Sequence, residues 1–513
     1  MASYDYVVVG AGSAGCVVAA RLSEDAGIHV AVLEAGRRQV PPVVAEDIAI
    51  PWHWGLVQNT PVDWGYRSVP QAHCLGRRFP EPRGRMPGGT SNLYILMHIR
   101  GHRSDYDNWA YNGCPGWSFD DVLRYFQKLE DQEDDTSPLA GKGGPLRVAS
   151  VSRHDPNPVS QAFIDACGEL GFPRTEDFNG PQMEGVGWHH VNIKDGKRHG
   201  IEDAYLYPAL ERQQNLELID GAQATRLLFD GRRCTGVEYV CNDRTETATA
   251  TREVIVCAGV IDSPKLLLLS GIGAASRLET VGIPVLIDLP GVGENFHNHV
   301  LVPVICVAKQ PIPRPHNNMS EAALFYRSTP GWPGPDMQMA FVHGSPLQVR
   351  DEPPPNIMVM LPGVVRPLSR GWVRLASADP FAKPLIHPNY LAVEADHRRL
   401  TDGVRIARRI YATRALADWV QTEVLPGPNV SDAQLGDDAR ARAESYHHQA
   451  GSCRMGLDAL AVVDPELRVH GIEALRVADA SIMPAVPSGN CHAGIVMIGE
   501  KCADLIKADR ARA

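Results

Sequence analysis

The first 36 residues have the pattern of a dinucleotide-binding βαβ unit. A short apolar run leads into Gly10, Gly12 and Gly15, spaced as Gly-x-Gly-x-x-Gly, and a second apolar run ends at Glu34. Gly10 suits a tight turn, Gly12 lets the backbone approach a pyrophosphate, and Gly15 lets the next helix pack closely on the strand. Because amide groups at a helix N-terminus bind anions, we expect dinucleotide phosphates there.

Glu34 indicates which dinucleotide this unit binds. It comes about twenty residues after the glycine turn, at the end of the second expected strand, where a carboxylate accepts hydrogen bonds from ribose hydroxyls. A 2′-phosphate on that ribose would be repelled by the carboxylate. The sequence therefore favours FAD or NAD over NADP.

Composition excludes several function classes. The 513 residues, 44% of them hydrophobic, can form two or three domains with sizeable cores. A net charge of −10 without a basic stripe argues against a nucleic-acid partner. The eleven cysteines are scattered, which predicts reduced thiols, no metal site and a cytoplasmic protein. No run of about eighteen uncharged apolar residues is present, so no membrane-spanning helix is expected. The N-terminal apolar run lacks the positive flank of a signal peptide.

A second glycine-rich turn lies within a long, loop-rich region that runs to about residue 110. Gly88 and Gly89 are followed by three small polar residues, a pattern that predicts another phosphate-binding turn leading into a helix. Irregular stretches of this length are usually functional. Two such turns indicate one long cofactor with two phosphates.

Periodicity predicts the main elements of the rest of the chain. Helices are expected over 116–130 and 158–171 and near 394–413, strands over 216–256, and a strand, turn and helix over 251–273. Residues 297–440 are rich in proline and strand-like segments, which predicts a separate antiparallel domain. The charged run that follows the first helix, residues 131–144, is interpreted as a solvated surface loop.

Several motifs occur in one order along almost the whole chain. They are VVVGAGSAG with LEAG, PRGRMPGGTS followed by RGHRSDYDNW, AGVIDSPKLLLLSGIG, LPGVGENFHNH, SRGWVRLASADP with HPNYL, GSCRMG with VVDPELRVHGIEALRVADASIMP, and PSGNCHAG. In these motifs the chain resembles the glucose/methanol/choline (GMC) oxidoreductase family of FAD-dependent alcohol oxidases and dehydrogenases. Within it, the chain is most similar to bacterial choline dehydrogenase-like, hydroxymethylfurfural oxidase-like and pyridoxine oxidase-like members.

The resemblance implies a mixed α/β (α+β) fold, in which a Rossmann-like FAD-binding domain is combined with a discontinuous antiparallel-sheet substrate domain. The FAD-binding domain is expected to comprise residues 1–150, 206–296 and 441–513. The substrate domain is expected to comprise 151–205 and 297–440.

The resemblance also implies the residues that bind FAD. They are Gly10, Gly12, Ser13, Ala14, Gly15, Glu34, Ala35, Trp64, Arg85, Gly88, Ser91, Asn92, Tyr94, Ile95, Ala224, Ala258, Gly259, Asp479, Ala480, His492 and Ala493. No metal ligand is implied.

Alcohol oxidation needs a base for the hydroxyl proton, and histidine suits this role because its pKa lies near neutrality. In the family, one histidine comes three residues before the Gly-Thr-Cys turn, which is His448 here. A second histidine or asparagine follows the Pro-Ser-Gly-Asn segment, which is His492 here. We expect His448 to be the base and His492 to stabilise the alkoxide. A slip of one residue would give the base role to His447.

The chain departs from the family pattern at several positions near the expected flavin. Tyr94 stands where relatives have an asparagine, which puts that residue's flavin contact in doubt. Leu93 stands where some members carry a histidine bonded covalently to FAD, so dissociable FAD is expected. Gly494 replaces a proline and Asn298 an aspartate.

The substrate pocket is expected to draw on residues 314–341 and on the loop from Tyr94 to His98. For a Met/Phe stripe of four residues in this stretch, core packing is the commoner explanation: Met319, Met337, Met339 and Phe341. Glu321 is a possible partner for a cationic substrate, but a structurally paired or solvated carboxylate is the commoner case.

The leading hypothesis is oxidation of a small alcohol, with electrons passed to oxygen or another acceptor. The motifs select neither the alcohol, nor the acceptor, nor an oligomeric state. Three other functions stay open on the same fold. They are a non-redox hydroxynitrile lyase, a light-driven fatty-acid decarboxylase and a non-catalytic flavin-binding protein.

Overall fold

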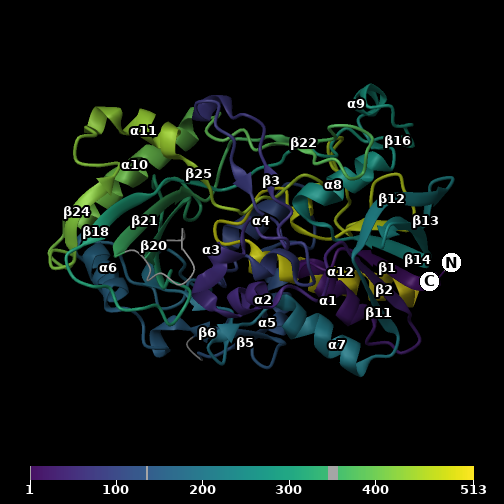
Figure 1. The fold of residues 1–513 in the computed structure, drawn as a ribbon, viewed down its shortest axis with the longest axis horizontal. Helices are drawn as coiled ribbons and strands as arrows, with labels where there is room; N and C mark the ends of the chain where they lie inside the picture. The colour runs from purple at the N-terminus through teal and green to yellow at the C-terminus, as the bar shows by residue number, and fades with distance from the viewer. Residues whose placement is uncertain (1, 135–136, 345–355, 513) are drawn as a thin grey trace.

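The computed structural model describes residues 2–134, 137–344 and 356–512. The chain forms two lobes, each built around one large sheet (Figure 1). Both termini lie at the outer end of one lobe, beside the first strands.

The lobe that holds the termini contains a seven-stranded sheet in the order β11-β2-β1-β14-β13-β12, with β26 beside β14. Its parallel strands are β1 (Ala2–Val9), β2 (Val30–Glu34), β11 (Leu216–Asp220), β14 (Arg244–Val256) and β26 (Leu475–Val477). β12 (Ala222–Asp230) and β13 (Arg233–Cys241) extend it as an antiparallel hairpin. The central parallel strands β1 and β2 and the end of β14 contain runs of buried Val, Ile and Leu, as expected for a sheet covered on both faces.

Glycines set the start of α1 (Ser13–Leu22) against this sheet. Gly10 has φ +99°, and a Cβ on Gly15 would lie 1.8 Å from the Gly10 carbonyl oxygen. Any side chain at Gly15 would therefore push α1 away from β1. On its other side α1 packs against the long C-terminal helix α12 (His492–Arg512), where Gly499 faces Val17.

The other lobe contains an eight-stranded antiparallel sheet in the order β24-β18-β21-β20-β19-β7, which β17 and β25 extend beside β21. Its strands are β7 (Gly185–Trp188), β17 (Val300–Leu301), β18 (Val304–Ala308), β19 (Ala322–Tyr326), β20 (Met337–His343), β21 (Ile357–Val364), β24 (Val420–Leu425) and β25 (Glu444–Ser445). Helices α6 (Pro158–Glu169) and α10 (Glu394–Tyr411) cover one face.

The remaining elements surround the two sheets. The helices are α2 (Pro42–Ala49), α3 (Trp54–Val57), α4 (Arg103–Tyr111), α5 (Phe119–Leu129), α7 (Tyr207–Arg212), α8 (Gly259–Leu269), α9 (Ala275–Thr280) and α11 (Leu435–Arg442). Short strands include β3 (Tyr66–Arg67), β4 (Pro80–Glu81), β5 (Glu130–Gln132), β6 (Leu146–Ser150), β8 (His190–Val191), β16 (Ile287–Asp288) and β22 (Trp372–Arg374).

The predicted α/β architecture and most predicted elements are confirmed, since α5, α6 and α10 lie where helical periodicity placed them.

The boundaries between the two domains stay a prediction. β7, from the segment 151–205, pairs with β19, and β25 belongs to the eight-stranded sheet although 441–513 was expected with the FAD-binding domain. After the second glycine turn the chain forms only a 3₁₀ turn, Gly89–Asn92, in place of the expected helix.

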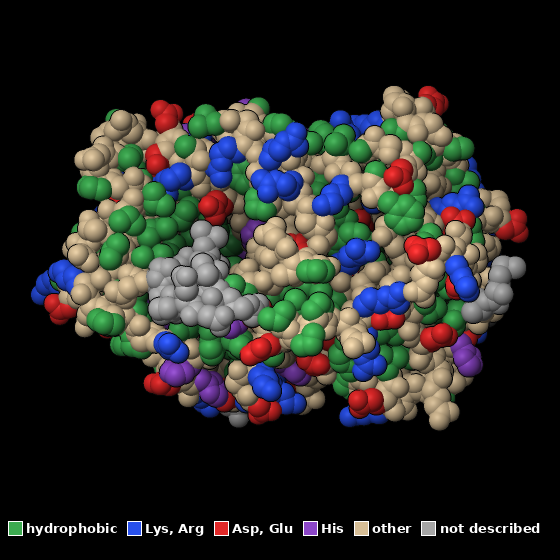
Figure 2. All heavy atoms as spheres, viewed as in Figure 1, with side chains coloured by type: hydrophobic (Ala, Val, Ile, Leu, Met, Phe, Trp, Pro, Cys, Tyr) green, Lys and Arg blue, Asp and Glu red, His purple; other side chains and the backbone are tan. Residues whose placement is uncertain are grey.

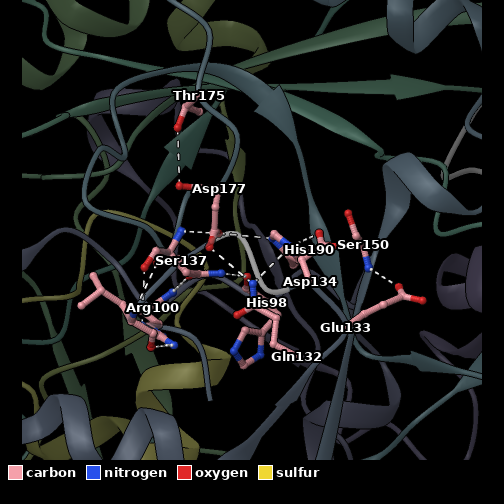
Figure 3. Close-up of polar contacts among 12 residues, drawn as sticks. His98, Arg100, Gln132, Glu133, Asp134, Ser137, Ser150, Thr175, Asp177 and His190 are labelled. Atoms are coloured by element: carbon pink, nitrogen blue, oxygen red, sulfur yellow. Dashed lines mark hydrogen bonds and ion pairs between the residues drawn. The ribbon is translucent and has the colours of Figure 1, made fainter. Parts of the chain in front are cut away.

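The interpretation of residues 131–144 as a solvated loop is wrong at its start. Gln132 and Asp134 are buried, and His190 lies between Asp134 and Asp177, with ring nitrogens 3.2 and 3.3 Å from their carboxylates (Figure 3). Charge density alone did not reveal this burial, because the partner carboxylate and histidine come from segments more than forty residues away.

Three further observations concern the cysteines, membrane-spanning helices and surface charge. All eleven cysteines are free, and ten of them are buried. No helix in the described ranges is both long and apolar enough to cross a membrane. On the face shown in Figure 2, positive and negative side chains are interspersed rather than gathered by sign.

Candidate functional site

A cavity of about 640 Å³ is lined by residues of both lobes. Most of the residues predicted from the sequence line it: Gly10, Gly12, Ser13, Ala14, Glu34, Ala35, Trp64, Ser91, Tyr94, Ile95, Ala224, Ala258, Gly259, His448, Asp479, Ala480 and His492. The fold therefore brings the N-terminal glycine turn, the second glycine turn and the two C-terminal histidines to one space.

Five predicted residues do not line the cavity but support its walls. Gly15 packs on the Gly10 carbonyl, and the Arg85 guanidinium lies 4.8 Å from the centre of the Trp64 ring. The Gly88 amide donates to Ala11 O (2.7 Å), Asn92 Nδ2 donates to Pro87 O (3.0 Å), and Ala493 is fully buried in α12.

The two glycine turns meet at one end of the cavity. A Cβ on Gly89 would lie 2.9 Å from the Gly12 Cα, so the two backbones touch. A Cβ on Gly12 would meet nothing within 4 Å, because this residue faces open space in the cavity. The arrangement leaves backbone amides and room for phosphates, as the sequence predicted.

Glu34 lies at the same end and is held by the backbone. Its carboxylate accepts from the amides of Ala11 (2.9 Å) and Gly36 (2.8 Å). Burial raises the pKa of Glu34 to about 7, although both amides act to lower it. A carboxylate fixed in this way has lone pairs left to accept hydrogen bonds from ribose hydroxyls.

His448 has partners on both ring nitrogens. Asn490 Nδ2 lies 3.1 Å from Nε2, and His299 Nδ1 lies 3.0 Å from Nδ1. Burial lowers the pKa of His448 well below its ordinary value, and the neighbouring His299, His447 and Arg83 lower it further. The ring is therefore neutral. Because the Asn490 amide donates to Nε2, the proton is on Nδ1 and the basic lone pair is on Nε2.

His492 is buried and faces the cavity, and neither of its ring nitrogens has a hydrogen-bond partner in the described part of the chain. Its ring lies against that of Tyr94, with centroids 4.6 Å apart. Burial lowers the pKa of His492 to about 3, with His98 and Arg198 contributing. A neutral imidazole with unused polar atoms in a cavity indicates a ligand position, since buried polar groups normally have partners.

His447 also lines the cavity but is held differently. It has φ +63°, and its ring nitrogen lies 3.2 Å from Ser445 Oγ on the preceding strand. Unlike His448, it makes no contact with Asn490, and burial lowers its pKa to about 3. These contacts favour His448 over His447 as the base.

The sequence analysis missed two residues beside His448. Asn490 and His299 contact the two ring nitrogens, and the Asn298 side chain accepts from the His448 backbone amide (2.8 Å). Both lie inside quoted motifs, PSGNCHAG and LPGVGENFHNH, so the signal was present in their positions. The contacts themselves join His448 to a residue 42 positions later (Asn490) and one 149 positions earlier (His299), so they could not be read from local spacing.

Tyr94 occupies the position that departs from the family pattern. Its hydroxyl donates to Asn192 Oδ1 (2.7 Å), and Asn192 Nδ2 lies 3.4 Å from His98 Nδ1. His98 in turn contacts Glu130 at 2.9 Å. The Tyr94 ring is thus held between the cavity and the buried polar residues Asn192, His98 and Glu130.

The expected pocket stretch 314–341 is corrected by the structure. Met337, Met339 and Phe341 pack in the core with α6 and α10, as the commoner explanation had it, while the cavity is lined by Val342 and by β21. Glu321 is buried and structurally paired, 3.5 Å from His343.

Comparison with known sequences identifies the family. Residues 4–301 and 367–499 match the N- and C-terminal profiles described as GMC oxidoreductase. The chain belongs to the GMC oxidoreductase family.

Individual members are similar over nearly the whole chain. Human mitochondrial choline dehydrogenase is 41% identical over 99% of this chain and 90% of its own length. An alcohol dehydrogenase [acceptor] of Pseudomonas putida is 37% identical over 98% and 95%. The crystal structure of pyridoxine 4-oxidase from Mesorbium loti superimposes with a TM-score of 0.93 at 34% identity, covering 98% and 99%. The predicted family, fold class and oxidoreductase class are thereby confirmed.

GMC oxidoreductases depend on FAD, and this cavity fits that cofactor. Gly12 opens on to the cavity without an obstructing atom, and the orphaned nitrogens of His492 face it at the catalytic end. Ala224, Ala258 and Gly259 also line the cavity, and their small or absent side chains leave room for a long dinucleotide.

Proposed function

We propose that this GMC oxidoreductase oxidises a small primary alcohol to an aldehyde at the cavity face of His448 and His492. The main supporting observation is that two neutral histidines, the half-buried His448 and the buried His492, line one cavity together with a dinucleotide cradle. Bound FAD would accept the carbinol hydride. His448 would accept the hydroxyl proton at Nε2, and His492 would donate a hydrogen bond to the same oxygen.

The burial of both histidines supports these roles. A base must be unprotonated before the reaction, and burial keeps His448 neutral at physiological pH. Asn490 and His299 fix the ring orientation and the tautomer, so the lone pair on Nε2 has a fixed direction. The substrate hydroxyl would replace the Asn490 amide at this lone pair before its proton is transferred. Pre-orientation of this kind lowers the entropy lost on reaching the transition state.

We also propose that FAD is held by Glu34, the two glycine turns and the other predicted lining residues without a covalent bond. Leu93 lines the cavity where some relatives carry a histidine, and its side chain packs with Val44, Val57 and Met86. An aliphatic side chain cannot form a covalent bond to the flavin ring.

Electrons would pass from the reduced flavin to oxygen or another acceptor, and the protein would act in the cytoplasm.

Anaerobic mixing in the dark tests the proposed function. The FAD-loaded protein is mixed with a panel of alcohols while the oxidised flavin absorbance is followed. Bleaching by an alcohol without light supports alcohol oxidation, and readmission of air then separates an oxidase from a dehydrogenase. No bleaching by any alcohol would contradict the proposal and favour the lyase, decarboxylase or non-catalytic alternatives.

A further inference from the structure

One face of the eight-stranded sheet forms an aliphatic wall of the cavity. Along β21, Ile357, Val359 and Leu361 alternate toward the cavity, since successive strand residues point to opposite faces. Val359 pairs with Ile305 on β18 and with Val342 on β20, and both of these also line the cavity. We call these five residues the aliphatic wall.

The aliphatic wall is connected directly to His448. Leu301 on β17 pairs with Glu444 on β25, and the chain runs from β25 into Tyr446 and His448. The Tyr446 ring stacks on His448 with centroids 4.7 Å apart, and it packs with Leu301 and Leu361. A substrate whose hydroxyl reaches Nε2 of His448 therefore places its carbon skeleton against Tyr446 and the wall.

In the described ranges, no carboxylate lines the cavity from β18, β20 or β21, the three strands of the aliphatic wall. Among the described residues, the acids that line the cavity are Glu34, Asp262, Asp479 and Glu444. Asp262 accepts from the Tyr66 hydroxyl (2.8 Å), and Asp479 accepts from the Gly259 amide (2.9 Å), both at the dinucleotide end.

The other two candidate carboxylates have charged or polar neighbours. Glu444 is exposed and lines the cavity from β25; desolvation raises the pKa of its carboxyl, and the positive charges of Arg77 and Arg442 offset its negative charge. Glu321 does not line the cavity; it accepts from Ser160 Oγ (2.8 Å) and from the Asn157 amide (2.8 Å). Neither is left as a counter-ion for a cationic substrate.

Most aromatic faces in the cavity are engaged as well. Arginine guanidinium groups lie over Trp64 (4.8 Å), Phe79 (4.9 Å) and Tyr94 (5.6 Å). Tyr446 faces His448. Recognition of a quaternary ammonium needs several free aromatic faces or a carboxylate, because burying an unpaired cation is costly. Of the described aromatic residues in the lining, Trp54 alone has no such recorded ring contact, and one ring does not make a cage.

We propose that the substrate is an uncharged primary alcohol with an apolar carbon skeleton, bound against the aliphatic wall, and that a quaternary ammonium alcohol is a poor substrate. This inference rests on the proposed function. The wall replaces water around the alkyl group, and each buried methylene strengthens binding about fourfold.

Choline and 3,3-dimethyl-1-butanol form a matched pair of probes, since they have nearly the same shape and differ by one positive charge. Anaerobic stopped-flow mixing gives the flavin reduction rate constant and apparent Kd for each. We expect the rate constant divided by the apparent Kd to be at least about tenfold higher for 3,3-dimethyl-1-butanol than for choline, because burying an unpaired charge is costly. An equal or higher value for choline would overturn the inference.

Two variants on one strand locate the effect. Ile305 and Val307 are two residues apart on β18, point to the same face and are both half-buried, but only Ile305 lines the cavity. Ile305→Glu is expected to shift the selectivity toward choline about tenfold or more, because it supplies the missing carboxylate. Val307→Glu is expected to leave the selectivity unchanged. Equal shifts in both variants, or none in Ile305→Glu, would contradict the assignment to the wall.

The outcomes separate this inference from the proposed function. Reduction of the flavin by choline or by polyols, with none by apolar alcohols, would overturn the aliphatic substrate while leaving alcohol oxidation in place. Absence of reduction by every alcohol would contradict the proposed function itself.

Discussion

At the residue scale, the proposed chemistry depends on Nε2 of His448. Because burial lowers the pKa of His448 below its ordinary 6.5, the neutral base is fully populated above that pH and is lost only at lower pH. We expect the flavin reduction rate constant to be independent of pH above 6.5, with an acidic limb below it. Stopped-flow reduction across pH 5–9 measures this, and a limb centred above pH 7 would contradict it.

Asn490 allows the position of that limb to be moved. The side chain lies 3.1 Å from His448 Nε2, so Asn490→Asp would place a negative charge beside the ring and raise the pKa of His448. We expect the acidic limb to shift to higher pH by about one to two units. Gln338→Glu, which alters the residue 3.4 Å behind Asn490, is the control and is expected to shift the limb less.

Glu34 provides a prediction about cofactor retention that is independent of catalysis. Glu34→Ala is expected to weaken FAD binding about 10- to 100-fold, the effect of losing hydrogen bonds to a charged group. Glu217→Ala, an exposed change on the adjacent strand β11, is the matched control. Flavin fluorescence on dilution reports the dissociation constant; equal constants for Glu34→Ala and the unmodified protein would refute the ribose role.

At the scale of elements, a network of buried ion pairs joins β5 to the segment that carries β8. It consists of His98, Arg100, Glu130, Asp134, Asp177 and His190. Burial alone would lower the pKa of His190, but Asp134 and Asp177 outweigh it and raise the pKa to about 9. For Glu130, burial raises the pKa while Arg100 and His98 lower it to about 2. Both groups are therefore charged at neutral pH, and the network contributes stability as ion pairs.

The His190 contribution has a defined pH dependence. A folded-state pKa above the unfolded value of about 6.5 gives stability that is fully present below pH 6.5 and is lost as pH rises through 9. We expect the free energy of unfolding to fall by on the order of 3 kcal/mol across that window. His190→Asn should flatten this slope in denaturant titrations, whereas His154→Asn, an exposed site, should retain it; equal slopes would contradict the account.

The elements also show what could be predicted from the sequence. The glycine turns, α5, α6 and α10 were predicted because each depends on local spacing or periodicity. The burial of Asp134 was missed because its partners Asp177 and His190 are distant in sequence. The pocket stretch was misplaced for a related reason: alternation along β20 does not tell which face meets α6 and which meets the cavity.

At the scale of the whole molecule, the site exists because two lobes meet. That Gly12, Glu34 and His492 line this cavity could be predicted, because the family resemblance assigns their motif positions to the cofactor and substrate site. The aliphatic wall could not, because its five residues come from three strands whose pairing is set only by the folded sheet.

Retention of FAD in the whole molecule is expected to be entirely non-covalent. Leu93 has no atom that could bond to the flavin, so acid precipitation or denaturation should release all the cofactor into the supernatant. Absorbance of the supernatant and pellet measures this. Yellow protein in the washed pellet would contradict the prediction.

The most direct test of the central claim is the rate of anaerobic flavin reduction in His448→Ala. The variant should retain FAD, since the residues predicted to hold the dinucleotide are unchanged in it. We predict that its reduction by an alcohol accepted by the unmodified protein is slower by about 10²–10⁴, the contribution of general-base catalysis. A variant that binds FAD and is reduced at the unmodified rate would show that His448 is not the base.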